Sequence, residues 1–390
     1  MSAEKNNFSV IVIGAGITGL STALHLNKLK IGRVAIISDH DSNTPSLSGP
    51  GIYSGGSPDN FTRLNHAWGP EFSKDIWEFG NHGLKLLNDF CDTHAVKTLR
   101  GDRIRITSDT LEIKEMREAT SLLNEAGFNC ALSDPMASPL ARASGDSLFV
   151  IQTEAKNGGY VDQIGLRSAL VAAIGQPKTF RLKAESIISN GDGIIVNLAH
   201  GTSLTAQMIV VAAHLRIPNL VPELGPAMVS FGDQWHLAKY SEPKFPAELL
   251  GTVFSFGHGY FWGVVKSATD VIIGGGRQFR KFAGFEETEV SFNAKSMNFL
   301  LKTLAKLTGP GLAPEILSSV GFLDCRPCDE IPVIGPMFGE NRIMIATGYS
   351  GAGLTLGFHA GKCLADMIAT GRSSTLPLKF HPARLRSLAD

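Results

Sequence analysis

Three glycines near the start of the chain have the spacing of a phosphate-binding turn. Gly14, Gly16 and Gly19 lie between an apolar run at residues 8–13 and a helical pattern of apolar residues at 20–29. In such a turn the first glycine permits the sharp bend, the second lets the backbone approach a pyrophosphate, and the third allows close packing of helix on strand. The helix N-terminus adds N–H donors and a positive dipole end. The pattern therefore predicts a dinucleotide site, for FAD or NAD, formed by Gly14, Ala15, Gly16, Ile17, Thr18 and Gly19.

The end of the next predicted strand carries further candidate contacts to a dinucleotide. Residues 34–37 form a buried strand, so that strand, turn, helix and strand complete one βαβ unit within about thirty residues. The position that holds the adenosine ribose in such units falls on Ser38, and Asp39 follows it. Ser38 can hydrogen-bond a ribose hydroxyl without adding charge, whereas Asp39 reaches the ribose if the strand end is shifted by one residue. Both are predicted to bind the cofactor.

A second glycine-rich stretch, residues 348–361, opens a predicted helix that runs to Ile368. A glycine-rich turn that enters a helix directs backbone donors and the positive helix end at a ligand. Close packing of the helix through its small residues is the alternative interpretation. The predicted cofactor contacts in this stretch are Gly348, Gly351, Ala352, Gly353, Leu354 and Thr355.

Arg326 is the candidate substrate-binding residue. Its guanidinium presents two parallel N–H donors, which fit a carboxylate better than a lysine does. An internal ion pair with Asp324 or Asp329 is the alternative role. Cys325 and Cys328 flank this arginine with the spacing of a redox pair or half a zinc site, but no second cysteine pair has metal-binding spacing. We therefore expect two ordinary thiols and no metal.

The composition of the chain limits the classes of protein that it can form: it has 390 residues, 36 basic and 36 acidic side chains, and 43% hydrophobic residues. This length exceeds one core of ~150 residues, which favours two subdomains. A net charge of zero argues against nucleic acid or an anionic membrane surface as a partner. No apolar run approaches the ~20 residues of a membrane span, and the first residues leave no room for a secretory signal. Five cysteines, an odd number, favour a reducing cytoplasm.

Local patterns predict the elements that position these residues. Helices are expected at 71–91, 111–126, 162–174 and 293–308, and residues 41–60 are expected to form an irregular loop. Short loops and strands are expected at 135–160, and a hairpin at 184–197 precedes an apolar strand at 208–213. Alternation and tight turns favour an antiparallel sheet for strands at 251–257, 259–265 and 270–276. Two short strands are expected at 333–335 and 343–347.

The C-terminal motifs carry a resemblance to a known family. Residues 322–336 contain Arg-Pro, an acidic residue and Pro-x-Ile-Gly, and the glycine-rich turn follows at 346–356. Together with the first βαβ unit and residues 159–162, these motifs resemble the D-amino-acid oxidase (DAO) superfamily of FAD-dependent enzymes, which includes glycine oxidase and sarcosine oxidase. The resemblance spans nearly the whole chain and indicates FAD rather than NAD.

The resemblance implies a mixed α/β fold with two domains. The Rossmann-like FAD-binding domain is expected to be discontinuous, with residues 1–60, 150–225 and 315–390. Residues 61–149 and 226–314 are expected to form a second, mainly antiparallel-sheet domain that binds the substrate.

The same resemblance implies roles for three candidate catalytic residues. Arg326 matches the arginine that clamps the substrate carboxylate. Residues 62–69 look like a segment of the sarcosine oxidase branch in which an arginine, here Arg63, lies close to the flavin ring; an exposed loop arginine is the alternative. Tyr260 matches aromatic residues that form the pocket over the flavin, and an ordinary core role is the alternative. Lys266 is a weak match for the lysine that promotes reaction with oxygen in sarcosine oxidases.

Two features of the chain leave alternatives open. In the family that the chain resembles, an Ala-Gly pair usually follows the strand at 208–213, and a glycine there lets the backbone approach the cofactor. Here His214 follows Ala213. Either the loop therefore lies farther from the dinucleotide, or the imidazole lies close to it. Some sarcosine oxidase relatives attach the flavin covalently through a cysteine near the position of Cys325 and Cys328, which makes covalent attachment an alternative to two ordinary thiols.

The implied activity is oxidation of the C–N bond of a small amino acid or N-alkyl amino acid. A hydride passes to flavin N5, water hydrolyses the resulting imine, and oxygen is the expected electron acceptor. No general base is required, so none is assigned. A dehydrogenase that passes electrons to a quinone or a partner protein is one alternative. A flavin-binding subunit of a larger complex is the other, because Ser38 and His214 depart from the family pattern.

Overall fold

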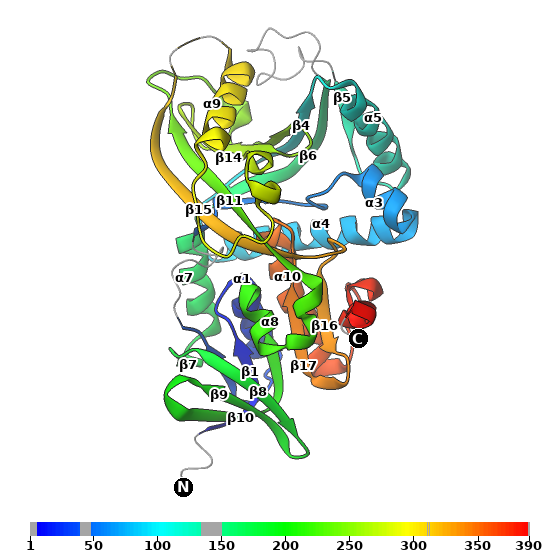
Figure 1. The fold of residues 1–390 in the computed structure, drawn as a ribbon, viewed down its shortest axis with the longest axis vertical. Coiled ribbons are helices and arrows are strands. Elements are labelled where there is room, and N and C mark those ends of the chain that lie inside the picture. Colours follow the sequence, from blue (N-terminus) through cyan, green and yellow to red (C-terminus); the bar gives the residue numbers. More distant parts are fainter. Residues whose placement is uncertain (1–5, 40–47, 134–149, 310, 312, 389–390) are drawn as a thin grey trace.

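The computed structural model describes residues 6–39, 48–133, 150–309, 311 and 313–388, and it contains two β-sheets with helices packed around them (Figure 1). The first sheet lies in the lower half of Figure 1 and has the strand order β16-β17-β10-β1-β2-β7, with β8 and β9 paired beside β10. Its strands are β1 (Asn7–Ile13), β2 (Val34–Ile37), β7 (Lys178–Phe180), β8 (Ala184–Asn190), β9 (Gly193–Leu198), β10 (Thr202–Val211), β16 (Val333–Met337) and β17 (Glu340–Thr347).

The centre of the first sheet is parallel and buried on both faces. β1 pairs in parallel with β2 and β10, and β10 pairs in parallel with β17. Helix α1 (Ile17–Lys28) follows β1 directly and packs against α7 (Gln163–Ile174) and α10 (Gly353–Thr370). The predicted βαβ unit is therefore confirmed, as is the hairpin, whose turn is held by Asn190.

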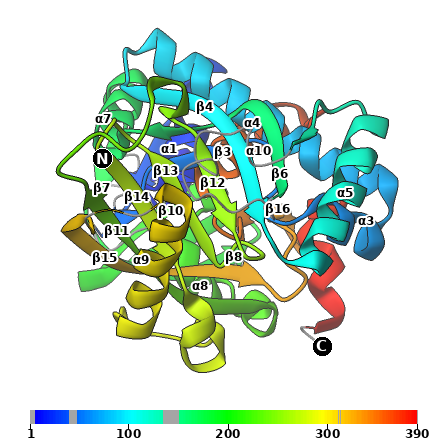
Figure 2. The same ribbon diagram turned by 90° about the horizontal axis from the view of Figure 1, so that it is seen from above.

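The second sheet is larger and mainly antiparallel, with the order β15-β11-β14-β13-β12-β4-β6-β3 and β5 paired to β6. The parallel pairing of β12 with β4 joins the strands β15-β11-β14-β13-β12 to the strands β4-β6-β3 in one sheet. Figure 2 shows this sheet from above, with α9 beside β15 and α5 at the opposite side. Its strands are β3 (Ile52–Ser54), β4 (Thr98–Thr107), β5 (Ala131–Ser133), β6 (Val150–Val161), β11 (Met228–Lys239), β12 (Val253–Phe256), β13 (Phe261–Val265), β14 (Asp270–Gly275) and β15 (Glu315–Pro327).

Most predicted helices are present, at slightly different bounds. The remaining α-helices are α3 (Phe61–Trp68), α4 (Pro70–Thr93), α5 (Thr110–Glu125), α8 (Ile217–Leu220) and α9 (Ala294–Thr308). α4 runs between the two sheets in Figure 1 and packs on α10. None of the helices in the described part of the chain is both long and apolar enough to cross a membrane.

Several elements differ from the sequence prediction. β3 interrupts the stretch 41–60 that was expected to be an irregular loop, and helix α3 and strands β4, β11 and β15 are not predicted at all. These three strands carry polar side chains on a face that lines a cavity, so the apolar alternation of an ordinary half-buried strand is missing. Of the predicted stretches 41–60 and 135–160, residues 41–47 and 135–149 lie outside the described residues.

The predicted division into domains does not coincide with the two sheets at every strand. β3, β6 and β15 belong to the second sheet, although the prediction places their residues with the FAD-binding domain. Where the domain boundaries lie stays a prediction.

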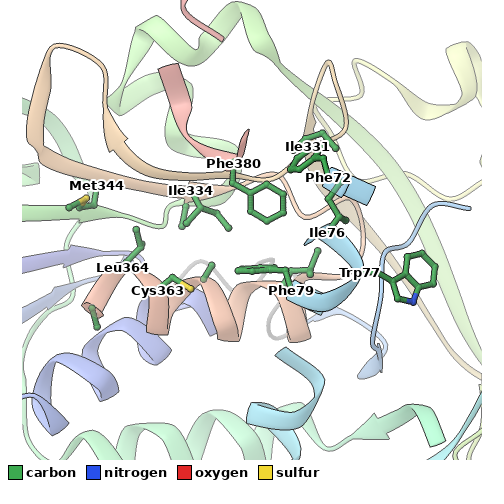
Figure 3. Close-up of a cluster of buried hydrophobic side chains, with 14 of the residues drawn as sticks. Phe72, Ile76, Trp77, Phe79, Ile331, Ile334, Met344, Cys363, Leu364 and Phe380 are labelled. Atoms are coloured by element: carbon green, nitrogen blue, oxygen red, sulfur yellow. The ribbon is translucent and has the colours of Figure 1, made fainter. Parts of the chain in front are cut away.

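A buried hydrophobic cluster joins the first sheet to the long helices (Figure 3). Phe79 of α4 stacks on His359 of α10 at 4.1 Å between ring centroids and meets Phe380 edge-on at 5.0 Å. Ile76 and Ile331 belong to the same cluster and also line the cavity described below. The core therefore forms part of the cavity wall and holds α4 and α10 beside it.

Candidate active site

One cavity of about 1120 Å³ is lined by residues of both sheets. It extends from the turn after β1 to the ends of β15 and α10, and so brings together segments from the whole length of the chain. The predicted site residues that line it are Gly14, Ala15, Gly16, Ile17, Thr18, Ser38, Asp39, Arg63, Tyr260, Arg326, Gly351, Gly353 and Leu354. Four predicted residues do not line it: Gly19, Gly348, Ala352 and Thr355.

The four residues outside the cavity have packing or capping contacts instead. A Cβ atom on Gly19 would lie 1.9 Å from the carbonyl oxygen of Gly14, so this glycine lets α1 sit close to the strand. A Cβ atom on Gly348 would lie 2.5 Å from Pro327. Thr355 donates a hydrogen bond to the carbonyl of Ser54 at 2.9 Å, and Ala352 is the N-cap of α10. These contacts hold the two glycine-rich turns in place without facing the cavity.

The N-terminus of α1 forms one end of the cavity. Its N-cap, Gly16, has no side chain to accept the first N–H groups, and no acidic residue lies in the first turn. Gly14 before it has a φ of 111°, a conformation that favours glycine. Because the first N–H groups of an α-helix have no partner within the helix, this end suits an anionic group such as a pyrophosphate.

Asp39 reaches the cavity, but its carboxylate already has a partner. Arg216, which lies 177 residues away in the chain, forms an ion pair with it and also donates a hydrogen bond to the carbonyl of Ala184 at 3.0 Å. Ser38 lies beside it, with its backbone N–H donating to Phe180 at 3.0 Å. Sequence reasoning missed Arg216 because nothing in the local pattern links it to the end of β2.

The N-terminus of α10 forms another part of the cavity wall. α10 also lacks a side-chain cap and an acidic residue in its first turn. Ser350, which lines the cavity just before it, has a buried Oγ without a hydrogen-bond partner among the described residues. A buried hydroxyl without a partner is unusual and indicates a polar ligand atom at this point. Two uncapped helix ends on one elongated cavity fit the pyrophosphate and the flavin of the predicted FAD.

The second sheet supplies the wall where a substrate would lie. In the register of β11 and β15, Phe231 stands opposite Asp324 and Asp233 stands opposite Phe322. Directly opposite residues share one face of a sheet, and all four line the cavity. This face combines aromatic rings with charged groups.

Arg326 lies on this face, at the end of β15. Its Nη1 donates to Glu330 at 2.8 Å, and its guanidinium lies 4.2 Å from the ring centroid of Phe285 and 5.6 Å from that of Phe231. Burial lowers the pKa of Arg326 from its ordinary value. Both predicted alternative partners are wrong, because Asp324 binds His214 and Asp329 binds Arg384.

Arg63 and Tyr260 reach the same cavity from different elements. Arg63, on α3, pairs with Asp59 at 2.9 Å, and about half of its side chain is exposed. The ring centroid of Tyr260 lies 5.9 Å from the guanidinium of Arg277. Lys266 does not line the cavity; its Nζ lies 4.3 Å from the ring centroid of Tyr160. The structure therefore does not bring Lys266 to the cavity, and its role in the reaction with oxygen stays a prediction.

The structure settles where His214 lies. Its backbone adopts a φ of 52°, which a glycine would adopt more readily, and its Nε2 lies 2.8 Å from Asp324 Oδ1. Burial alone would lower the pKa of His214, but Cys325 and Asp324 together raise it well above the ordinary value. The imidazole therefore lies at the cavity wall between the first sheet and β15, where these two neighbours favour its protonated form.

The two cysteines around Arg326 are separate thiols. Cys325 is buried, with its Sγ 3.6 Å from Thr347 Oγ1, whereas Cys328 is exposed and lines the cavity. The ligand atoms of His214, Asp324 and Cys325 lie within 4.8 Å of one another, close enough to hold a metal ion. His214 and Asp324, two of these three residues, already form a direct hydrogen bond with each other.

Sequence reasoning missed several charged residues of the cavity. Arg103 is buried and lies 3.5 Å from Glu154, and Arg105 donates to the carbonyl of Asp59 at 2.8 Å. Burial, together with the charge of Arg103, lowers the pKa of Arg105 to about 10. Arg277 also lines the cavity. The alternation of Arg103 and Arg105 is the one sequence signal that could have indicated a strand with a charged face.

Comparisons with known proteins identify the family of this chain and the likeness of its fold. Residues 9–367 match the family of FAD-dependent oxidoreductases described as DAO. No curated protein sequence matches the chain significantly. Because the family match spans most of the chain, it identifies the family directly.

Three solved structures show the likeness of the fold. L-proline dehydrogenase from P. horikoshii is similar with a TM-score of 0.78 and 16% identity, over 98% of both chains. Glycine oxidase from Geobacillus kaustophilus has a TM-score of 0.73 and 16% identity, over 96% of this chain and 98% of that one. Iminodiacetate oxidase from Chelativorans sp. BNC1 has a TM-score of 0.73 and 17% identity over the same shares. With the match to the family itself, these likenesses confirm the fold prediction, and the chain belongs to the DAO family of FAD-dependent oxidoreductases.

Proposed function

We propose that this protein oxidises the C–N bond of a small amino acid or N-alkyl amino acid, with FAD as its cofactor. The observation that carries the proposal is the position of Arg326, whose guanidinium lines the cavity against the rings of Phe285 and Phe231. The three similar structures bear the names of enzymes of glycine, iminodiacetate and L-proline. Each of these compounds contains an amine and a carboxylate.

The proposed role of Arg326 is to bind the substrate carboxylate. A planar guanidinium can donate two parallel hydrogen bonds, which fix both the position and the orientation of a carboxylate. Its present partner, Glu330, is about half exposed, whereas the side chain of Arg326 is largely buried. Because Glu330 reaches solvent, its carboxylate can turn away when a substrate carboxylate takes its place on Arg326.

The remaining contribution of the chain is orientation and the exclusion of water. Phe231 and Phe285 line the cavity beside Arg326, Trp262 also lines it, and these rings offer apolar surface to the carbon that reacts. FAD, when bound by the turn of α1 and the N-terminus of α10, supplies the acceptor for the hydride. A substrate held by its carboxylate presents its α-carbon at a fixed distance from Arg326, and this fixed orientation accelerates the reaction.

Oxygen is the proposed electron acceptor. A dehydrogenase that uses another acceptor is the second candidate, and one observation favours it: no lysine lines the cavity in the part of the chain that the structure describes. The resemblance to sarcosine oxidases assigns oxygen activation to a lysine. Hydrogen peroxide formed during turnover in air would support the oxidase, and turnover only with a dye or quinone would support the dehydrogenase.

The test of the proposed reaction is anaerobic bleaching of the flavin by a panel of amino acids and N-methyl amino acids, with Arg326→Ala as the variant. We expect the wild-type flavin to bleach with at least one substrate. We expect the variant to bind flavin normally but its substrate roughly 10- to 150-fold more weakly, because hydrogen bonds to charged groups contribute ~1.5–3 kcal/mol.

Arg342→Ala is the matched control for this variant. Arg342 pairs with Glu340 on β17 at 2.7 Å and does not line the cavity. We expect it to leave bleaching unchanged. Equal substrate affinity in wild type and Arg326→Ala would remove the assignment of Arg326, and a flavin that no amine bleaches would contradict the proposed function.

A further inference from the structure

Arg277 is a second arginine on the same wall of the cavity. It begins a short 3₁₀ helix, Arg277–Phe279, directly after β14. The turn before it is anchored, because Ser296 of α9 donates a hydrogen bond to the carbonyl of Gly276 at 2.6 Å. A Cβ atom on Gly276 would lie 2.8 Å from Ser296, so the turn packs directly on the helix. The backbone therefore holds Arg277 in a defined place.

The guanidinium of Arg277 lies among aromatic rings and has no polar partner. It is 5.3 Å from the ring centroid of Phe285, 5.4 Å from that of Phe231 and 5.9 Å from that of Tyr260. It makes no hydrogen bond or ion pair with any described residue, and its Nη1 is buried. A guanidinium has five N–H donors, so a buried one without an acceptor is expected to meet a ligand.

None of the nearby acids forms an ion pair with Arg277 among the described residues. Glu330 pairs with Arg326, and Asp324 pairs with His214. Asp233 accepts hydrogen bonds from the backbone N–H of Gln234 and from the side chain of Trp262, and it forms no ion pair with Arg277 among the described residues. Burial raises the pKa of Asp233 to about 6, and the positive charges of Arg277 and Arg280 act against this rise. Asp233 and Arg277 therefore interact through their charges, but no described residue accepts a hydrogen bond from the buried Nη1 of Arg277.

Arg277 and Arg326 lie close to each other. Both guanidinium groups contact Phe285, at 5.3 and 4.2 Å from its ring centroid, and both contact Phe231. Their separation therefore cannot exceed the sum of the two distances to Phe285. A molecule with two carboxylates a few bonds apart can reach both groups, whereas a monocarboxylate leaves one guanidinium without a partner.

We propose that the substrate is a dicarboxylic amino or imino acid, with one carboxylate on Arg326 and the second on Arg277. Aspartate, glutamate and iminodiacetate are members of this class. The inference rests on the proposed function and adds the substrate class. The charge of Arg277 repels a second cationic group of a substrate, and a neutral substrate side chain leaves this guanidinium, with its buried Nη1, without a counter-charge.

The experiment compares matched substrates on the flavin-loaded protein. Anaerobic bleaching gives an apparent dissociation constant for each member of three pairs: glutamate with glutamine, aspartate with asparagine, and iminodiacetate with sarcosine, with both enantiomers of the chiral ones. We expect the diacid of at least one pair to bind about 10- to 150-fold more tightly, which is the range for a hydrogen bond to a charged group. Similar affinities within all three pairs would overturn the inference.

The variants Arg277→Gln and Arg277→Lys test whether Arg277 causes the preference for a diacid over its matched monocarboxylate. We expect Arg277→Gln to lose the preference for the diacid, to keep the affinity for the monocarboxylate and to retain its flavin. We expect Arg277→Lys to restore part of the preference, because it keeps the charge. An equal loss for both members of a pair, or loss of the flavin, would show that Arg277 serves the fold or the cofactor instead.

The outcomes also separate this inference from the proposed function. Bleaching by monocarboxylic amines without any preference for diacids would overturn the role of Arg277 and leave the proposed function intact. Bleaching by no amine of either kind would overturn both. The wild-type comparison needs no variant, so the inference can be tested even if the substitutions at Arg277 impair folding.

Discussion

The charged residues of the cavity are mostly paired with partners from distant parts of the chain. Asp39 pairs with Arg216, and His214 pairs with Asp324. These pairs link the first sheet to the loop after β10 and to β15. Arg277 stands out because it lines the same cavity without such a partner among the described residues.

The ion pair of His214 predicts how stability depends on pH. Its pKa in the folded protein is raised well above the ordinary 6.5, chiefly by Cys325 and Asp324 acting against burial. A raised pKa stabilises the fold fully below the unfolded value and loses this contribution as the pH rises through the folded value. We therefore expect His214→Gln to reduce the free energy of unfolding more at pH 6 than at pH 9.

Denaturant unfolding of both proteins at the two pH values measures this effect. His66→Gln is the control, since His66 is exposed and pairs only with Glu118 at the surface. An equal loss of stability at both pH values would show that His214 contributes by packing or by a neutral hydrogen bond rather than by its charge.

Helices α1 and α10, which follow the two predicted cofactor-binding turns, pack closely against each other. α1 and α10 lie side by side, and a Cβ atom on Gly361 of α10 would lie 2.7 Å from the Cβ of Ser21 and from the carbonyl of Thr18 on α1. Ser21 also donates a hydrogen bond to the carbonyl of Phe358 at 2.6 Å. This close packing fixes the positions of the two helices relative to each other.

We expect Gly361→Ala to destabilise the protein by about 1–3 kcal/mol, the usual cost of overpacking a tight interface. The added methyl group separates α1 from α10, so flavin affinity should fall as well. Gly191→Ala is the control, because a Cβ atom there meets nothing within 4 Å. Thermal unfolding and flavin content measure both effects, and a variant as stable as the control would contradict this packing.

At the scale of the whole molecule, one cavity connects the two sheets, and the proposed cofactor lies across it. A ligand that binds only the folded state stabilises it by an amount that grows with the logarithm of the ligand concentration, about 2.7 kcal/mol at a hundred times its dissociation constant. The cytoplasmic location remains a prediction.

We expect removal of FAD to lower the melting temperature and added FAD to restore it as the concentration rises. Differential scanning fluorimetry of the flavin-free and flavin-loaded protein measures the shift, and NAD is the control ligand. A melting temperature that does not respond to FAD, in a protein without flavin absorbance, would contradict the cofactor assignment.

The sequence alone determined the turns and helices whose formation depends on residues close together in the chain. The glycine spacing from Gly14 to Gly19 sets a turn between β1 and α1, because the conformations and contacts that it requires are local. The hairpin at Asn190 and the helices α4, α5, α7, α9 and α10 follow from turn residues and apolar periodicity in the same way. Arg326 was predicted to be the substrate-binding residue because a short sequence motif surrounds it.

Only the tertiary structure decided which charges meet. β4, β11 and β15 escaped prediction because their polar residues face a cavity, and that cavity exists only after both sheets have assembled. The ion pair of Asp39 with Arg216 and the approach of Arg277 to Arg326 join residues that are far apart in the chain. Local patterns carry no information on such distances, so the arrangement of charges in the cavity follows from the packing of the two sheets rather than from any single motif.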